Sequence, residues 1–323
     1  MDFLFSKIDP TALSRPSDNA ALIYALFIFL EITYIVLRKR GGRYETRDTS
    51  TSIMMGTGSA VAGILFGGIG IFLVVQVYNA RIMSIETTPL MLIVLFFLDD
   101  FRFYWSHRFS HRIRWFWANH VIHHSSQHFN LSTALRQAWF NSFSGMVLIY
   151  LPFVWLGVNP YALLFVGSVN LLYQFFIHTE AIAKFPRWIE AVMNTPSHHR
   201  VHHSTLPQYL DKNYAGVFII WDHLFGTFVE EDLNDEMKYG IVKNLGTFNP
   251  FRVATHELFS IFKDISSSGL TLKQRLAYLF AVPGWSHDGS RQTSDDIRKQ
   301  ANLPTLGAKE PKQGSAPLTE SVP

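Results

Sequence analysis

Residues 107–124, HRFSHRIRWFWANHVIHH, carry five histidines at helical spacing. An HxxxH pair begins at His107, and an HxxHH group begins at His120. Side chains at positions i, i+3 and i+4 of an α-helix lie on one face. Each group therefore directs two or three imidazoles toward one point, so the stretch predicts helices that present a metal site.

A second HxxHH group begins at His199, and His178 stands alone at the end of a predicted helix. These histidines are too many for one ion, which takes about four to six ligands, and they suit two ions with room for an exogenous ligand. All-nitrogen ligation suits iron, zinc, copper or nickel, so spacing alone leaves the metal open. We expect the ligands to be His107, His111, His120, His123, His124, His178, His199, His202 and His203.

The other histidines give weaker signals. His198 lies about 100° from His199 around a helix, and we interpret it as a donor to the ligands. His128 follows the first HxxHH group by four residues and stays a candidate. The isolated histidines are interpreted as surface or packing residues: His223, His256 and His287.

The composition around these groups indicates a membrane protein. Of the 323 residues, 48% are hydrophobic and 16% are charged, against roughly 25% charged in soluble domains. Apolar runs at 20–37, 54–78 and 89–105 approach or exceed the length that spans a bilayer, and shorter runs at 143–157 and 161–177 fit a hairpin. We predict an all-α, multi-span helical integral membrane protein with about four to five transmembrane helices.

Charge sets the expected orientation. Five basic residues lie between 38 and 47, directly after the first apolar run, and mark the cytoplasmic side. Counting spans from there places 106–136 and 178–323 in the cytoplasm. All histidine groups then lie in one cytoplasmic helical cap, in either a bacterial inner membrane or the endoplasmic reticulum.

Several classes of protein are excluded. The chain has no cysteine, which rules out disulfides, zinc fingers and thiolate-bound iron–sulfur clusters. Its net charge is only +3. Aromatic and basic residues alternate over 101–117, and beside a span they indicate an interfacial belt rather than a nucleic-acid surface.

Two carboxylates draw attention. Asp100 lies two helical turns before His107, where it suits a hydrogen bond to a ligand histidine, or a pair with Arg102 or Arg108. Glu31 interrupts the first apolar run, where it either snorkels, pairs within the bundle, or acts as a functional carboxylate.

The motifs resemble the fatty acid hydroxylase/sterol desaturase superfamily of membrane di-iron oxygenases. The resemblance implies two iron ions on the nine histidines, O2 as oxidant, and Asp100 and Glu180 as the candidate catalytic carboxylates. It assigns no residues to an organic cofactor. It runs from about residue 90 to 288 and is carried by residues 100–111, 119–137, 171–180, 194–203, 211–228 and 283–288.

The stretches NLSTALRQ (130–137) and NYAGVFIIWD (213–222) are similar to the ether-lipid branch of that superfamily. This implies hydroxylation beside the ether oxygen of a 1-O-alkylglycerol, giving a fatty aldehyde and glycerol. Tetrahydrobiopterin or another external donor supplies the electrons, since no GxGxxG fingerprint follows a predicted strand. The implied partners are a lipid substrate from the bilayer and a reductase or pterin-recycling protein. We expect no nucleic acid, and the oligomeric state stays open.

Two alternatives remain at this point. One is a hydroxylase or desaturase of another lipid, such as an acyl chain, a sterol or an aminolipid, because fold does not determine substrate. The other is a histidine-rich metal transporter. A transporter places its ligands at mid-membrane on broken helices, whereas these groups lie outside the apolar runs.

The expected organisation has four parts. Residues 1–88 form N-terminal membrane spans, and 89–260 form a fatty acid hydroxylase-type di-iron domain. Residues 261–285 form a surface helix and turn, and 286–323 a disordered polar tail.

Overall fold

The computed structural model describes residues 2–15 and 20–306. Within these ranges the chain is helical, with two isolated β-bridges, Met193–Phe218 and Ser204–Tyr239, and no longer strand. The predicted all-α class is therefore confirmed. The α-helices are α1 Ala20–Arg38, α2 Thr46–Phe66, α3 Gly68–Asn79, α4 Pro89–Arg112, α5 Arg114–His124, α6 Leu151–Leu156, α7 Pro160–Phe176, α8 Arg187–Glu190, α9 Pro196–His203, α10 Ile220–Phe225, α11 Pro250–Ile265, α12 Leu272–Phe280 and α13 Ser294–Gln300.

Short 3₁₀ turns join several of these helices. They are η1 Asp2–Phe5, η2 Pro10–Ala12, η4 Leu131–Leu135, η5 Asn141–Phe143, η6 Met146–Ile149 and η7 Pro207–Tyr209. Residues 143–157, predicted as one apolar run, are divided between such turns and the short helix α6.

Among the described residues, fewer helices have spanning length and composition than we predicted. Helix α1 qualifies alone, and α2 with α3 qualifies as a pair bent by 51°, which makes one candidate or at most two. Helix α7 is a shorter apolar helix. Helix α4 is long but continues from its apolar half into the polar, histidine-bearing half, which lowers its hydropathy.

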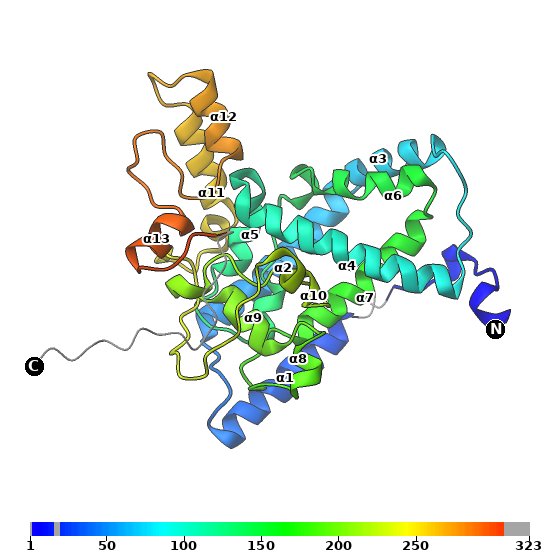
Figure 1. The fold of residues 1–323 in the computed structure, drawn as a ribbon, viewed down its shortest axis with the longest axis horizontal. Coiled ribbons are helices and arrows are strands. Elements are labelled where there is room, and N and C mark those ends of the chain that lie inside the picture. The colour runs from blue at the N-terminus through cyan, green and yellow to red at the C-terminus, as the bar shows by residue number, and fades with distance from the viewer. Residues whose placement is uncertain (1, 16–19, 307–323) are drawn as a thin grey trace, which may run out of the picture.

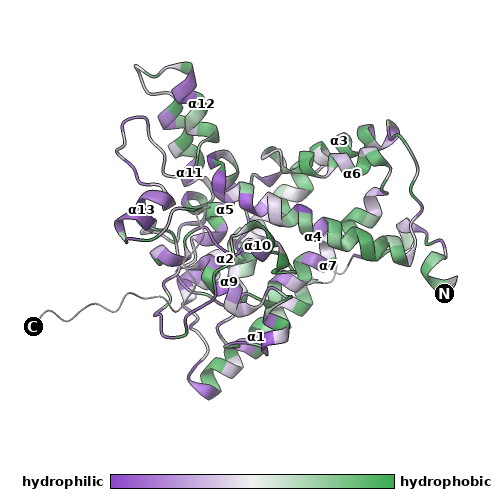
Figure 2. Ribbon diagram, in the orientation of Figure 1, coloured by the Kyte–Doolittle hydropathy of each residue, from purple (hydrophilic) through white to green (hydrophobic). Residues whose placement is uncertain are grey.

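Helix α4 is the central element and packs against α5 and α7. It begins at a clear signal, because the Thr88 hydroxyl accepts a hydrogen bond from the Met91 amide and Pro89 opens the helix. Its first half contributes Leu95 to an apolar core with Val154 and Val166. Apolar residues gather on α1, α3, α4, α6 and α7, and polar ones on the segments around α9 and α13 (Figures 1 and 2).

The C-terminal region differs from the expected surface helix and disordered tail. Helices α11 and α12 form a hairpin that projects from the body of the molecule (Figure 1). Beyond it, α13 forms because Thr293 and Asp296 make a capping box. The buried Arg298 guanidinium donates to the carbonyls of Pro304 and Gln208, which fastens α13 to the body. The rest of the predicted tail, 307–323, lies outside the described residues.

Candidate metal centre

The structure brings all nine predicted histidines together in two groups. In each group the ligand nitrogens lie within 4.8 Å of one another. The five-histidine cluster comprises His107, His111, His120, His124 and His202, and the four-histidine cluster comprises His123, His178, His199 and His203.

Four elements supply these side chains. The HxxxH pair comes from the last turns of α4, and the two HxxHH groups come from α5 and α9. His178 follows the end of α7. Two histidines of each HxxHH group meet in one cluster, as expected, whereas the third, His123 of α5 or His202 of α9, belongs to the other cluster.

The nitrogen geometry fits metal ions. The Nε2 atoms of His107 and His120 are 2.9 Å apart, as are those of His178 and His199. Two nitrogens bound to one transition-metal ion at about 2.1 Å lie roughly 3 Å apart when they meet near a right angle. Several buried ring nitrogens have no hydrogen-bond partner in the described part of the protein, among them Nε2 of His202 and of His203. These nitrogens are therefore available to bind a metal ion.

Outer hydrogen bonds orient these rings. The Nδ1 atom of His107 lies 2.8 Å from the Tyr214 carbonyl oxygen, and that of His178 lies 2.7 Å from the Gln174 carbonyl oxygen. Each Nδ1 therefore donates its proton, which leaves the lone pair on Nε2 facing the cluster. Without a cation, two such lone pairs at this separation repel, so the arrangement favours bound metal.

The segment 211–215 supports the five-histidine cluster. The Lys212 carbonyl oxygen lies 3.0 Å from His202 Nδ1, and the Asp211 carboxylate lies 3.1 Å from His111 Nδ1. Asp222 holds the segment by accepting hydrogen bonds from the amides of Tyr214 and Ala215, both at 2.8 Å. Sequence reasoning missed Asp211, and only its place in the family-like 211–228 stretch pointed to it.

Burial keeps the imidazoles neutral, which is the form that binds metal. It lowers the pKa of His178 to about 4. Burial and the neighbouring histidines hold the pKa values of His123, His199 and His203 well below the ordinary value of 6.5.

Asp100 does not make the predicted hydrogen bond to a ligand histidine. Its buried carboxylate accepts hydrogen bonds from the amides of Val217 and Phe218, and from the side chains of Trp221 and Asn170. It therefore holds the residues that lead into α10. These residues directly follow the 211–215 segment, which supports the five-histidine cluster. The ion pair with Arg102 that was considered for Asp100 is formed instead by the neighbouring Asp99, at 2.9 Å.

Glu180 lies beside the four-histidine cluster but contacts it only through aromatic rings. Its carboxylate accepts a hydrogen bond of 2.9 Å from Tyr239, and the Tyr239 ring stacks on Phe129. Phe129 in turn packs against the rings of His178, His199 and His203.

Glu31 pairs within the fold, which was one of the readings open from the sequence. It is buried and accepts hydrogen bonds from Tyr44, Thr179 and the Leu131 amide. Helix α1 is thereby tied to the residue that follows His178.

The remaining histidines lie outside both clusters. His198 is buried and its Nε2 lies 2.9 Å from the Glu190 carboxylate, rather than against a ligand histidine. His223 stacks on Phe228, and Tyr278 contacts the ring of His287. The His256 ring lies 3.0 Å from the Val253 carbonyl oxygen.

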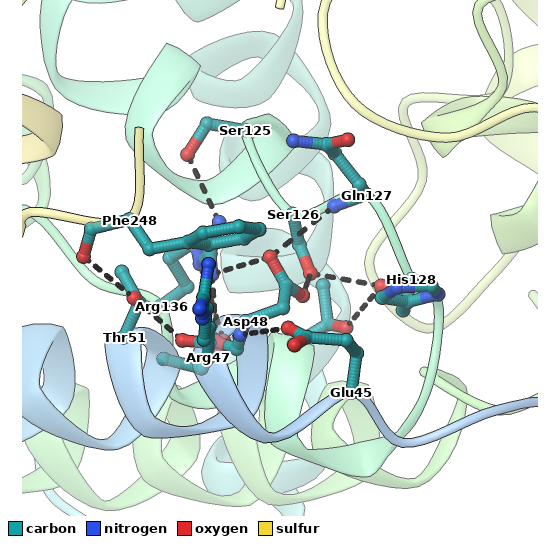
Figure 3. Close-up of polar contacts among 12 residues, drawn as sticks. Glu45, Arg47, Asp48, Thr51, Ser125, Ser126, Gln127, His128, Arg136 and Phe248 are labelled. Carbon is teal, nitrogen blue, oxygen red and sulfur yellow. Dashed lines mark hydrogen bonds and ion pairs between the residues drawn. The ribbon is translucent and has the colours of Figure 1, made fainter. Parts of the chain in front are cut away.

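A buried ion pair braces the loop that follows α5. Asp48 on α2 lies 2.8 Å from the Arg136 guanidinium, and both side chains are almost fully buried. Asp48 also accepts hydrogen bonds from Ser126 and the Gln127 amide, and Arg136 donates to Ser125 (Figure 3). Nothing in the sequence pattern pointed to this pair, because its partners are far apart in the chain.

A cavity of about 80 Å³ opens beside the five-histidine cluster. Its wall combines ligand histidines with residues from the 204–211 and 240–242 segments and the region before α13. The lining includes His111, His124, His202, Trp117, Asp211 and Ile241. A small polar molecule can therefore approach the centre from this side.

Fold and site together define a helical protein with paired histidine clusters suited to two metal ions. Residues 92–227 match the family model for fatty acid hydroxylase. This part of the chain is therefore a fatty acid hydroxylase domain, which confirms the resemblance in its motifs.

Several relatives with assigned functions are similar to this chain, and the alkylglycerol monooxygenases match most of it. Alkylglycerol monooxygenase of Homo sapiens is 38% identical over 273 residues, which are 81% of this chain and 58% of the relative. The enzyme of the same name from Danio rerio is 35% identical over 83% of this chain and 59% of its own length. Ornithine lipid hydroxylase OlsE of Rhizobium tropici is 27% identical over 41% of this chain and 39% of its own length.

The chain thus spans somewhat under three fifths of the alkylglycerol monooxygenases it matches. No solved structure matches it significantly.

Proposed function

We propose that this protein is an O2-dependent di-iron lipid monooxygenase that cleaves the ether bond of 1-O-alkylglycerols. The observation that carries the proposal is the division of nine buried or half-buried histidines into two adjacent clusters inside a fatty acid hydroxylase domain. Similarity to alkylglycerol monooxygenases supports the substrate class.

Two iron ions, one in each cluster, would supply the oxidising power that a strong C–H bond requires. The protein's own contribution is to hold the ligand rings. Carbonyl oxygens of Tyr214, Lys212 and Gln174 lie against ring Nδ1 atoms, and Phe129 covers the four-histidine cluster against water.

In the proposed reaction, one oxygen atom of O2 enters the C–H bond of the carbon beside the ether oxygen, and the other leaves as water. Two electrons and two protons from an external donor complete the balance. The resulting hemiacetal then breaks its carbon–oxygen bond, which releases a fatty aldehyde and glycerol.

We assign the electron donor to the cavity beside the five-histidine cluster. Its lining combines ligand histidines and Asp211 with apolar side chains such as Trp117 and Ile241, which suits a small ring-containing reductant, with tetrahydrobiopterin or another external donor as the candidate. A reductase or pterin-recycling protein would regenerate this donor.

We further propose that the protein is an integral membrane protein with its histidine clusters on the cytoplasmic face. Helix α1 and the bent pair α2–α3 are the candidate spans by length and composition, and the apolar first half of α4 would provide the return crossing that brings the clusters to the cytoplasmic side. Arg38 at the end of α1 and Arg40 and Arg43 before α2 are exposed and favour the cytoplasm for that loop.

A second candidate keeps the chemistry and changes the lipid. Similarity to ornithine lipid hydroxylase and to a cholesterol 25-hydroxylase-like protein favours hydroxylation of an aminolipid or a sterol as the alternative. The metal-transporter hypothesis has less support, since both clusters are built from the polar ends of helices rather than from mid-span breaks.

Turnover by purified protein tests the proposal. Iron-loaded protein in detergent is supplied with 1-O-hexadecylglycerol, O2 and tetrahydrobiopterin, and hexadecanal is quantified. We expect aldehyde that requires both O2 and the pterin. Absence of aldehyde from protein shown to hold iron contradicts ether cleavage and directs the search to lipids that gain one oxygen atom in expressing cells.

A further inference from the structure

The hairpin of α11 and α12 exposes large apolar side chains, while the inner side of α11 combines three buried apolar residues with polar ones. The polar face of α11, formed by Glu257, Ser260 and Asp264, points into the body of the protein. Arg114 donates to all three of these side chains at 2.7–2.9 Å, and Arg291 donates to Asp264.

The apolar face of the hairpin points outward. Phe251 and Phe259 are each 68% exposed and Phe262 is 54% exposed, and their spacing places them on one side of α11. Helix α12 continues the surface with residues at every fourth position, namely Leu272, Leu276 and Phe280. Contiguous exposed apolar surface of this kind marks an interaction site.

This face continues into the membrane-span candidate. Phe251 packs edge-to-face on Trp139, whose ring lies against Gly58 of α2 and donates to the Met55 carbonyl oxygen. Further along α2, Leu65 and Phe66 are also exposed.

The exposed charged side chains at the edge of the hairpin are all cationic. Both acidic side chains of residues 250–280 are paired inward, with Arg114 and Arg291. The fully exposed charges of the same segment are Arg252, Lys263 and Lys273, all cationic. An apolar face with a cationic rim complements the headgroup region of an anionic bilayer.

We propose that the α11–α12 hairpin is a membrane-surface anchor, whose phenylalanine and leucine face enters the headgroup–acyl boundary of a bilayer that contains anionic lipid. The anchor would hold the histidine clusters at a constant depth, because α5, which bears three of the histidines, packs directly on α11 and α12. This inference rests on the proposed membrane location and does not depend on the reaction.

The absence of native cysteine allows single-site labelling of the full chain. Phe262→Cys and Leu276→Cys are labelled with an environment-sensitive fluorophore, in nanodiscs of phosphatidylcholine and phosphatidylglycerol. Leu26→Cys on α1 is the lipid-exposed reference, and Lys299→Cys on α13 is the water-exposed reference. All four positions are exposed in the structure, so the substitutions leave the core intact.

We expect the labels at 262 and 276 to emit at shorter wavelength than the label at 299, and nitroxide-bearing lipids to quench them as they quench the label at 26. If the labels at 262 and 276 show the emission and quenching of the label at 299, while the label at 26 lies in lipid, the anchor is wrong but the membrane location stands. A label at 26 that also lies in water overturns the membrane location itself. Labels shielded from both lipid and water, with energy transfer between donor-labelled and acceptor-labelled copies, overturn the anchor in favour of a dimer.

Charge reversal tests the lipid preference. Lys263→Glu with Lys273→Glu should reduce lipid quenching at 276, and replacing phosphatidylglycerol by phosphatidylcholine should do the same. Lys299→Glu is the matched control and should change nothing. If neither the charge reversal nor the lipid replacement alters the quenching, the proposed role of anionic lipid is wrong.

Discussion

His123 and His202 each break the local pattern, since each joins the cluster opposite its sequence neighbours. His123→Ala should therefore empty mainly the four-histidine cluster, and His202→Ala mainly the five-histidine cluster. We expect each variant to lose about one of two bound ions, because a ligand is removed from one set only, and to lose turnover. Elemental analysis of the purified variants measures the metal per chain.

His256→Ala provides the control, because this side chain lies outside both clusters and contacts only its own helix, at the Val253 carbonyl. It should keep both ions and full turnover. Full metal content in the His123 or His202 variant would remove that residue from the ligand set.

Asp211 adopts a left-handed backbone conformation (φ 57°) and holds His111 through its Nδ1 atom. Asp211→Ala should weaken metal binding at the five-histidine cluster by about 10- to 100-fold, as loss of such outer hydrogen bonds does elsewhere. Asp211→Asn tolerates the same backbone conformation and keeps an acceptor, so its loss should be smaller. Competition with a chelator measures both, and equal losses would mean that the negative charge of Asp211 is required, rather than an acceptor or the backbone conformation.

Acid should destabilise the metal-free protein. The unfolded histidines take up protons near pH 6.5, whereas burial holds the folded pKa of His178 at about 4 and those of His123 and His203 well below normal. The unfolded state therefore binds more protons as pH falls, and the free energy of unfolding should decrease below about pH 6.5, by up to about 1.4 kcal/mol per pH unit for each such histidine.

Thermal unfolding of the metal-free protein between about pH 7 and pH 5 measures this slope. His178→Gln should reduce the slope of unfolding free energy against pH by the contribution of one histidine. Stability that is constant or rises on acidification would contradict the assigned burial.

Helix α2 supports the loop after α5 through the ion pair between Asp48 and Arg136. Asp48→Ala leaves the Arg136 charge buried without its partner, which should cost about 3–5 kcal/mol of unfolding free energy and loosen the loop after α5. Because the pair also carries a desolvation cost, Asp48→Leu with Arg136→Met should recover much of this stability. Thermal unfolding compares the two, and a double variant no more stable than Asp48→Ala would contradict this account.

The sequence predicted those parts of the molecule that depend on local periodicity. Eight of the nine candidate ligands follow from HxxxH and HxxHH spacing on helices, and His178 was placed by its position at the end of a predicted helix. Pro89 and Thr88 mark the start of α4. The division of each HxxHH group between two clusters depends on how α5 and α9 pack, and no local pattern records this. Three of the four partners of Asp100 are likewise more than a hundred residues away in the 217–221 segment, and the fourth is Asn170, so its role could not be predicted from helical spacing.

At the scale of the whole molecule, the apolar elements and the histidine clusters are linked by buried polar contacts. Glu31 joins α1 to Thr179 beside His178, and Asp48 joins α2 to the loop after α5. The helices proposed to lie in the membrane therefore fix the position of both clusters relative to the bilayer.

This arrangement makes the sidedness testable. The basic loop between α1 and α2 should remain in the cytoplasm, so the loop between α3 and α4 should lie on the opposite side and the 235–240 segment on the cytoplasmic side. Single cysteines at the exposed positions Ser84 and Glu236 report these two segments. In sealed vesicles of known orientation, an impermeant maleimide should label Ser84→Cys only from the outer face and Glu236→Cys only from the cytoplasmic face. Labelling of both from one face would mean that α4 does not cross the bilayer, and the reversed pattern would place the histidine clusters outside.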